Sequence, residues 1–162
     1  MIDHNTLKKE FYLNSDVINP SQALLGKIIQ TNIHQKKTEG MIVETEAYAG
    51  EGDKASHAYQ NKLTKRNEVM FQAGGVAYVY LCYGIHSLFN IVTNHKGIPH
   101  AILIRAIEPL SGIKQMLKRR NMNKLSYNLT SGPGKLSQAL GLTLKENGLS
   151  LQGPTIIIYD VG

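Results

Sequence analysis

Short apolar runs recur along the chain and predict a structure rich in strands. Each run is enriched in Val, Ile and Tyr, as is typical of β-strands. The predicted strands are Lys27 to Ile33, Gly40 to Tyr48, Val76 to Cys82, Phe89 to Thr93, Ala101 to Ile107 and Thr155 to Tyr159. Together these strands predict a mostly antiparallel sheet.

Two helices are predicted before the first strand. One runs from Thr6 to Leu13. The other begins at Asn19, which caps it, and has Pro20 in its first turn. Asparagine at a helix cap and proline in the first turn are both favoured, and Gly26 is expected to end this helix.

Two more helices are predicted between the last two strands. The segment from Pro109 to Arg120 has an amphipathic pattern, with an apolar stripe formed by Leu110, Ile113 and Leu117. A short helix is expected after Ser131-Gly-Pro133 and runs through Leu136 to Leu140. The polar stretch between Gly50 and Gly75 lacks a clear period and is predicted to be a functional loop.

Composition and organisation indicate one α+β domain over residues 1–162, a mostly antiparallel sheet with flanking helices. The chain has 162 residues, of which 42% are hydrophobic and 19% charged, and we find no repeat or linker. It contains one cysteine, so an intramolecular disulfide and a thiolate zinc site are excluded. Cys82 is predicted to be a small buried strand residue.

The charge of the chain favours a polyanionic partner such as nucleic acid. The formal net charge is +6 and the sequence pI is about 9.4. Basic residues gather at Lys62 to Arg66 and at Lys114 to Arg120, although one such cluster is more often a solvated face. No apolar run is long enough to span a bilayer and no secretion signal is evident, so we expect a soluble intracellular protein without membrane contact.

Carboxylates gather on the predicted strand that ends at Tyr48. Because side chains alternate along a strand, Glu44, Glu46 and Tyr48 are expected on one face. Carboxylates removed from water need hydrogen bonds, so this row suggests the wall of a pocket. A solvated edge face is the alternative that this segment alone leaves open.

A second strand carries a row of tyrosines. Tyr78, Tyr80 and Cys82 are expected on one face, and Tyr83-Gly84 follows as a turn. A tyrosine at the tip of a hairpin is exposed and can insert between base pairs. An ordinary turn tyrosine is the alternative.

Several motifs, taken together and in order, resemble the alkyladenine (3-methyladenine) DNA glycosylase family. The resemblance runs from about Phe11 to Leu142. Its motifs are Glu44-Thr-Glu-Ala-Tyr48, Ala55-Ser-His57, Arg66-Asn67 with Met70-Phe71, Tyr78-Val-Tyr80 with Tyr83-Gly84, Asn90, Arg105-Ala-Ile-Glu-Pro109 and Ser131-Gly-Pro133 with Lys135-Leu136.

The resemblance implies a monofunctional glycosylase that extrudes a damaged purine from duplex DNA and hydrolyses the bond between base and deoxyribose. This activity initiates base excision repair. The implied fold is similar to the C-terminal domain of formyltransferases and has a protruding β-hairpin that enters DNA. A monomer is expected, and so is a location in the cytoplasm, nucleoid or nucleus.

The resemblance also implies roles for the pocket residues. Tyr48, His57 and Tyr80 match residues that stack on the extruded base, as enzymes of this kind require. Glu46 matches the general base that activates water, and Arg105 matches the residue that orients this water and the adjoining phosphate. An aromatic sandwich favours cationic purines through cation–π attraction.

Other matched residues concern specificity and DNA contact. Asn90 matches a polar residue on the pocket floor, and Tyr83 matches the side chain that fills the space left by the nucleotide. Arg66, Ser131 and Lys135 are candidates for contact with DNA; the last two precede or begin a helix, a natural seat for phosphate. A simple helix cap is the alternative for that segment.

The sequence predicts no metal and no cofactor. The histidines have no metal-ligand spacing, and no lysine matches the Schiff-base position of bifunctional glycosylases. Glu44 has no implied catalytic role. Hydrogen bonding within the fold is expected for it instead.

The C-terminus departs from the family pattern. Family members continue beyond the strand that matches Thr155 to Tyr159, whereas this sequence stops at Gly162. The domain is therefore expected to lack the family's C-terminal segment. Two alternatives to catalysis follow: a damaged-DNA-binding module without activity, and an RNA-binding domain, since a similar fold class occurs by analogy in an accessory domain of a tRNA-modifying enzyme.

Overall fold

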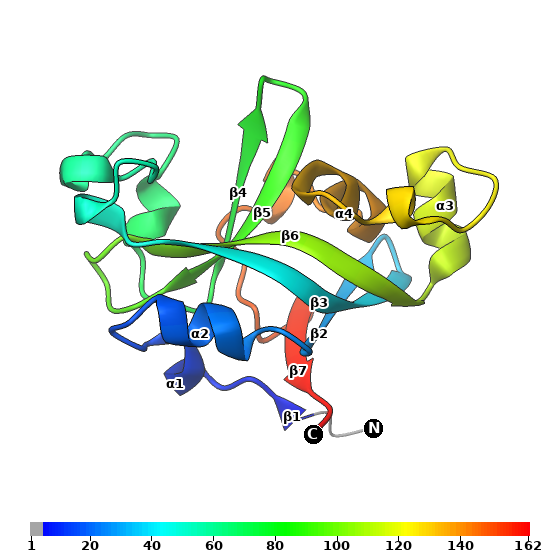
Figure 1. Cartoon of the computed structure of the whole chain (residues 1–162), viewed down its shortest axis with the longest axis horizontal. Coiled ribbons are helices and arrows are strands. Elements are labelled where there is room, and N and C mark those ends of the chain that lie inside the picture. The colour runs from blue at the N-terminus through cyan, green and yellow to red at the C-terminus, as the bar shows by residue number, and fades with distance from the viewer. Residues whose placement is uncertain (1–4) are drawn as a thin grey trace.

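A seven-stranded antiparallel sheet carries the fold of this protein, whose computed structural model describes residues 5–162 (Figure 1). The strand order is β1-β7-β2-β3-β6-β5-β4, and every pairing is antiparallel. The strands are β1 (Asn5–Thr6), β2 (Ile28–Ile33), β3 (Lys36–Tyr48), β4 (Ala77–Cys82), β5 (His86–Thr93), β6 (His100–Ser111) and β7 (Ile156–Asp160). All six predicted strands are present, so the prediction of a mostly antiparallel α+β sheet is confirmed.

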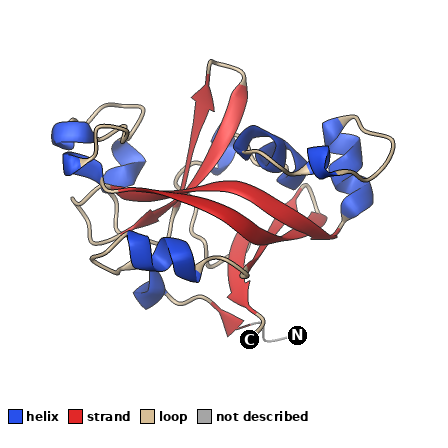
Figure 2. Ribbon diagram, viewed as in Figure 1, coloured by secondary structure: helices blue, strands red, loops and turns tan. Residues whose placement is uncertain are grey.

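Within residues 5–162, four α-helices and five short 3-10 turns surround the sheet (Figure 2). In the view of Figure 1, α1 and α2 lie below β3 and β6, whereas α3 and α4 lie above them. The α-helices are α1 (Lys9–Tyr12), α2 (Ile18–Ala23), α3 (Ile113–Arg120) and α4 (Pro133–Leu140). The 3-10 turns are η1 (Gly50–Gly52), η2 (Tyr59–Asn61), η3 (Glu68–Phe71), η4 (Tyr127–Leu129) and η5 (Leu144–Glu146).

The prediction that a helix begins at Pro109 was wrong, because β6 continues through that segment. Pro109 pairs with Gly40 of β3, and Ser111 pairs with Glu39. At this end of β6 the β5 strand has already stopped pairing, so the missing amide of proline breaks no ladder on that side. Gly112, with φ of +73°, then turns the chain into α3.

The first predicted helix is also shorter than expected. Thr6 lies in β1, where it pairs with Tyr159, and α1 covers only Lys9–Tyr12. The cap of the next helix was predicted wrongly as well. Asp16, rather than Asn19, accepts hydrogen bonds from the first backbone amides of α2, while Pro20 does lie in the first turn.

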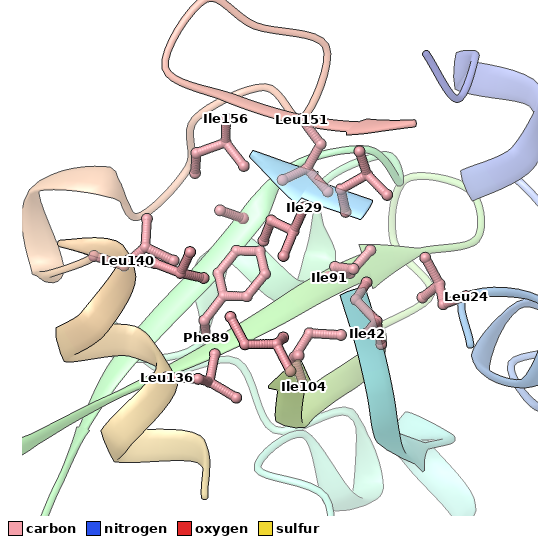
Figure 3. Close-up of a cluster of buried hydrophobic side chains, with 14 of the residues drawn as sticks. Leu24, Ile29, Ile42, Phe89, Ile91, Ile104, Leu136, Leu140, Leu151 and Ile156 are labelled. Carbon is pink, nitrogen blue, oxygen red and sulfur yellow. The ribbon is translucent and has the colours of Figure 1, made fainter. Parts of the chain in front are cut away.

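Apolar side chains from most elements meet in one large core (Figure 3). Phe89 of β5 is fully buried there, and Leu136 and Leu140 of α4 close the core from one side. A smaller core lies under the loop between β3 and β4 and consists of Ala58, Val69, Met70, Tyr78, Val92 and Ala101. This second core fixes the long polar loop against the sheet.

Candidate active site

Two extra residues interrupt the ladder between the longest strands. Ile42 pairs with Ile107 and Thr45 with Ile104, but between these pairs Val43 and Arg105 have no partner in the ladder. Such β-bulges bend the strand locally and redirect a side chain. Here one of the two redirected residues is the arginine that the family resemblance singles out.

Arg105 and Tyr48 hold the carboxylate of Glu46 from two sides. Arg105 Nη1 donates to Glu46 Oε2 at 2.9 Å, and the hydroxyl of Tyr48 donates to Oε1 at 2.8 Å. The side chains of Glu46 and Arg105 are 43% and 45% exposed, so solvent water reaches the carboxylate. The expected proximity of Glu46 and Tyr48 on one face is thus observed. Glu44 instead lines a groove with Glu108, away from this contact.

An aromatic pocket opens beside this carboxylate. Its empty volume is about 290 Å³, and it is lined by Tyr48, Ala55, His57, Met70, Tyr78, Tyr80, Asn90 and Ala101. All four residues that the sequence assigned to base binding, Tyr48, His57, Tyr80 and Asn90, are therefore brought together. Tyr48 belongs both to the pocket wall and to the contact with Glu46, so the two parts of the site are joined through one side chain.

The ring of His57 packs edge-on against Tyr80. Their centroids lie 4.4 Å apart at an interplanar angle of 68°. His57 Nδ1 is also 2.9 Å from the hydroxyl of Tyr78. Burial, and then the charge of Arg66, lower the pKa of His57. The imidazole is therefore neutral at pH 7.

The tyrosines of the pocket are also held in their neutral form. Burial raises the pKa of Tyr48, Tyr78 and Tyr80, and for Tyr48 the hydrogen bond to Glu46 acts in the same direction. Neutral rings that can hydrogen-bond at their edges suit a flat heterocycle.

Tyr78 is a pocket residue to which the sequence gave no role. It is 1% exposed, and its ring centroid lies 5.3 Å from that of Tyr80. The signal was available, because Tyr78 and Tyr80 are two residues apart on one strand and were expected on the same face. Asn90 lies in the adjacent strand, 2% exposed, and donates from Nδ2 to the carbonyl of Tyr78 at 3.3 Å.

Asn67 fixes the loop that presents His57. Its side chain is buried and donates from Nδ2 to the carbonyls of His57 and Lys62, at 3.0 and 2.8 Å. Its Oδ1 accepts from the amide of Thr64 at 2.7 Å. One amide group thus ties three points of an otherwise irregular loop.

A turn joins β4 to β5 at the top of the molecule in Figure 1. Its central residues Tyr83 and Gly84 have φ of +52° and +68°, the backbone that tight hairpin turns require. Tyr83 is 93% exposed and Ile85 75% exposed. Cys82, predicted to be buried, is only half-buried, because it lines a hollow at the foot of this turn.

Ser131 and Lys135 line the same hollow as Tyr83, and they lie outside the aromatic pocket. Lys135 Nζ donates to Asn128 Oδ1 at 2.6 Å. Arg66 stays close to the pocket wall instead, with its Cζ 5.1 Å from the centroid of the Tyr80 ring. The candidate DNA contacts thus lie in two separate places.

Residues 5–162 contain no group of three or more metal-ligating side chains close enough to hold an ion. The expectation of a metal-free site stays a prediction. In the same part of the chain, no helix is long and apolar enough to cross a membrane.

Known proteins similar to this chain share one description. Residues 10–161 match the family described as methylpurine-DNA glycosylase. A Chlamydia abortus protein named "Putative 3-methyladenine DNA glycosylase" is 51% identical over 153 residues, which cover 94% of this chain and 80% of the relative. A Bacillus cytotoxicus protein of the same name is 46% identical over 152 residues, covering 91% of this chain and 74% of the relative.

These similarities, together with an aromatic pocket beside a hydrogen-bonded carboxylate, define the class of protein: a DNA glycosylase, an enzyme of DNA repair. Within that class, the chain belongs to the methylpurine-DNA glycosylase family. The family resemblance predicted from the sequence motifs is thereby confirmed.

Proposed function

We propose that this enzyme hydrolyses the N-glycosidic bond of alkylated purines, 3-methyladenine among them, after extruding them from duplex DNA. This step would initiate base excision repair. One observation carries the proposal: the carboxylate of Glu46 is held by Tyr48 and Arg105 at the edge of a pocket whose walls are aromatic.

The pocket walls suit the chemistry of these bases. A purine alkylated on a ring nitrogen carries a positive charge, which neutral aromatic faces attract. Tyr48 and Tyr80 provide such faces, and the lowered pKa of His57 means that its ring adds no opposing charge at neutral pH. Asn90, on the pocket floor, would reject purines with an exocyclic amino group at the wrong edge.

Glu46 is the proposed general base. It would take a proton from water while the water oxygen attacks the anomeric carbon and the purine leaves with the electrons of the broken bond. Each carboxylate oxygen accepts one hydrogen bond from the protein and keeps capacity for a water. Arg105 would orient this water and the neighbouring phosphate, and the resulting enzyme would be monofunctional, acting as a hydrolase without metal or cofactor.

Access to the base requires that the nucleotide leave the helix. Tyr83, at the tip of the β4–β5 turn, is proposed to fill the space left behind. Ser131 and Lys135, beside the same turn, are proposed to contact the DNA backbone. A formyltransferase-like fold, a DNA-inserting role of the hairpin, and a monomeric state of the protein belong to the same proposal.

Release of free base from duplex DNA that contains 3-methyladenine or 7-methylguanine tests this function. Glu46→Gln is expected to abolish release and leave lesion binding largely intact. Glu44→Gln is a matched control, because Glu44 lies two residues away on the same strand but lines a separate groove. Full release of the base by Glu46→Gln would contradict the assignment of Glu46 as the general base.

The same experiment separates the alternatives. Lesion binding without base release by the unmodified protein would favour a damage-binding module without activity. Tighter binding of structured RNA than of lesion-containing duplex would favour an RNA-binding domain. In either case affinity is expected to fall as salt rises, because lysine and arginine contacts to phosphate release counterions.

A further inference from the structure

Arg66 has a fixed place beside the pocket. Its Nη2 donates to the carbonyl oxygen of Leu81 at 3.0 Å, and its Cζ lies 5.1 Å from the centroid of the Tyr80 ring. The residue that follows it, Asn67, is buried and hydrogen-bonded on three sides, so the backbone from which Arg66 projects is well anchored. The guanidinium therefore lies beside the ring while its side chain stays exposed, and the contact of Arg66 with DNA stays a prediction.

The charge of Arg66 has no ion-pair partner among the described residues. In the described residues 5–162 it forms no ion pair, whereas the other arginine of the site, Arg105, is paired with Glu46. Its field reaches the pocket wall, since it lowers the pKa of His57, although less than burial does, and it opposes the rise in the pKa of Tyr78 and Tyr80. Arg66 is thus a positive charge without an ion-pair partner beside the base-binding site.

Arg66 is not one of the residues that line the pocket, so a bound base and the guanidinium can both use the Tyr80 ring. An aromatic ring attracts a cation, but two cations at one ring also repel each other. A neutral base does not experience this repulsion. We propose that Arg66 is a specificity-determining residue: it weakens the binding of positively charged purines relative to neutral purines of the same shape.

This inference rests on the proposed function and refines it. The pocket would then combine aromatic walls that attract cationic bases with one charge that moderates the attraction. Removing the charge is expected to make the enzyme more selective for cationic lesions, not less active in general. A purely structural role of Arg66 predicts the opposite pattern, a similar loss for every lesion.

Two duplexes that differ only in charge at the lesion provide the test. One contains 7-methylguanine, which is cationic, and the other contains 7-methyl-7-deazaguanine, which has the same shape and is neutral. Dissociation constants for both are measured with the unmodified protein, Arg66→Gln and Arg66→Lys. Release of 7-methylguanine is followed in parallel. Because each variant is compared with itself on two duplexes, a loss of folded protein cancels in the ratio of the two constants.

In Arg66→Gln, the affinity for the cationic base relative to the neutral base is expected to rise about three- to tenfold. This is the size of a partly screened interaction between like charges. Arg66→Lys keeps the charge, so its ratio is expected to stay close to that of the unmodified protein. An unchanged ratio in Arg66→Gln, or an equal shift in both variants, would overturn the inference while base release continued. Absence of both base release and lesion binding in the unmodified protein would overturn the proposed function and this inference together.

Discussion

The phenol of Tyr48 donates a 2.8 Å hydrogen bond to Glu46 while its ring lines the pocket next to His57 and Tyr80. One side chain therefore connects the surface that would stack on the base with the group that would activate water. Stacking of a base on Tyr48, as proposed, would therefore be coupled to the orientation of the carboxylate. A substitution that keeps the ring and removes the hydroxyl separates these two roles.

Tyr48→Phe is expected to lower the rate of base release about ten- to a hundredfold, because the carboxylate loses one of the two donors that orient it. Lesion affinity should change by less than threefold, roughly, since the ring remains. Single-turnover kinetics and a separate binding titration measure the two effects. A variant that loses affinity and keeps its single-turnover rate would contradict the coupling.

His57 is expected to titrate below its usual pKa of 6.5. Its ring is partly removed from water where it contacts Tyr78 and Tyr80, and Arg66 lies nearby, so the protonated form is disfavoured in the folded protein. His57 then binds a proton more readily in the unfolded chain than in the folded protein. The contribution of His57 to the free energy of unfolding therefore declines as the pH falls below 6.5. The pKa of His57 is measured from the NMR chemical shifts of the imidazole protons during a pH titration, with the His57→Gln variant used to assign the signals. A pKa at or above 6.5 would refute the prediction.

Asn67→Ala is expected to destabilise the fold by about 2 kcal/mol or more, because carbonyls of the loop lose their donors in a buried place. The loss of stability should be greatest in the loop that carries His57. Thermal melting and amide hydrogen exchange of residues 55–70 measure it. Asn123→Ala, at an exposed position, is the control. Its free energy of unfolding should stay within about 0.5 kcal/mol of that of the unmodified protein. Equal melting of both variants would mean that the loop is held by other contacts.

Tyr83→Ala is expected to slow base extrusion about tenfold or more without affecting stability, because a wedge that fills the vacated space is lost. Tyr127→Ala offers a close match, since the two tyrosines are 93% and 94% exposed. Fluorescence of 2-aminopurine placed beside the lesion reports extrusion. If the two variants behave alike, Tyr83 has no special role at the hairpin tip.

Local patterns in the sequence were sufficient for β2 to β7, because alternation of apolar residues reflects burial on one face, but they missed the two-residue β1. They failed where a distant partner decides the structure. Leu110 fits a helical stripe with Ile113, but pairing of Pro109 with Gly40 keeps that segment in β6. A pattern within one segment contains no information about the strand that will lie beside it.

The site residues were predicted mainly through the family motifs. Those motifs suggested roles for the residues but did not show which side chains contact one another. Tyr78 was passed over because its hydroxyl partner, His57, lies 21 positions away in the sequence. Arg66 was predicted to contact DNA, and charge alone could not show that its guanidinium also lies over the Tyr80 ring. Both cases depend on contacts between the loop and β4, which only the folded chain contains.

The bulges at Val43 and Arg105 cancel each other. The pairing of Ile42 with Ile107 and of Thr45 with Ile104 follows the same alignment, as though the two strands had never been interrupted. The paired strands β3 and β6 can therefore be regarded as a continuous ladder into which each strand inserts one extra residue. Removal of both residues would leave the pairing from Gly40 to Tyr48 in one alignment, and Glu46 would lose the arginine that holds its carboxylate.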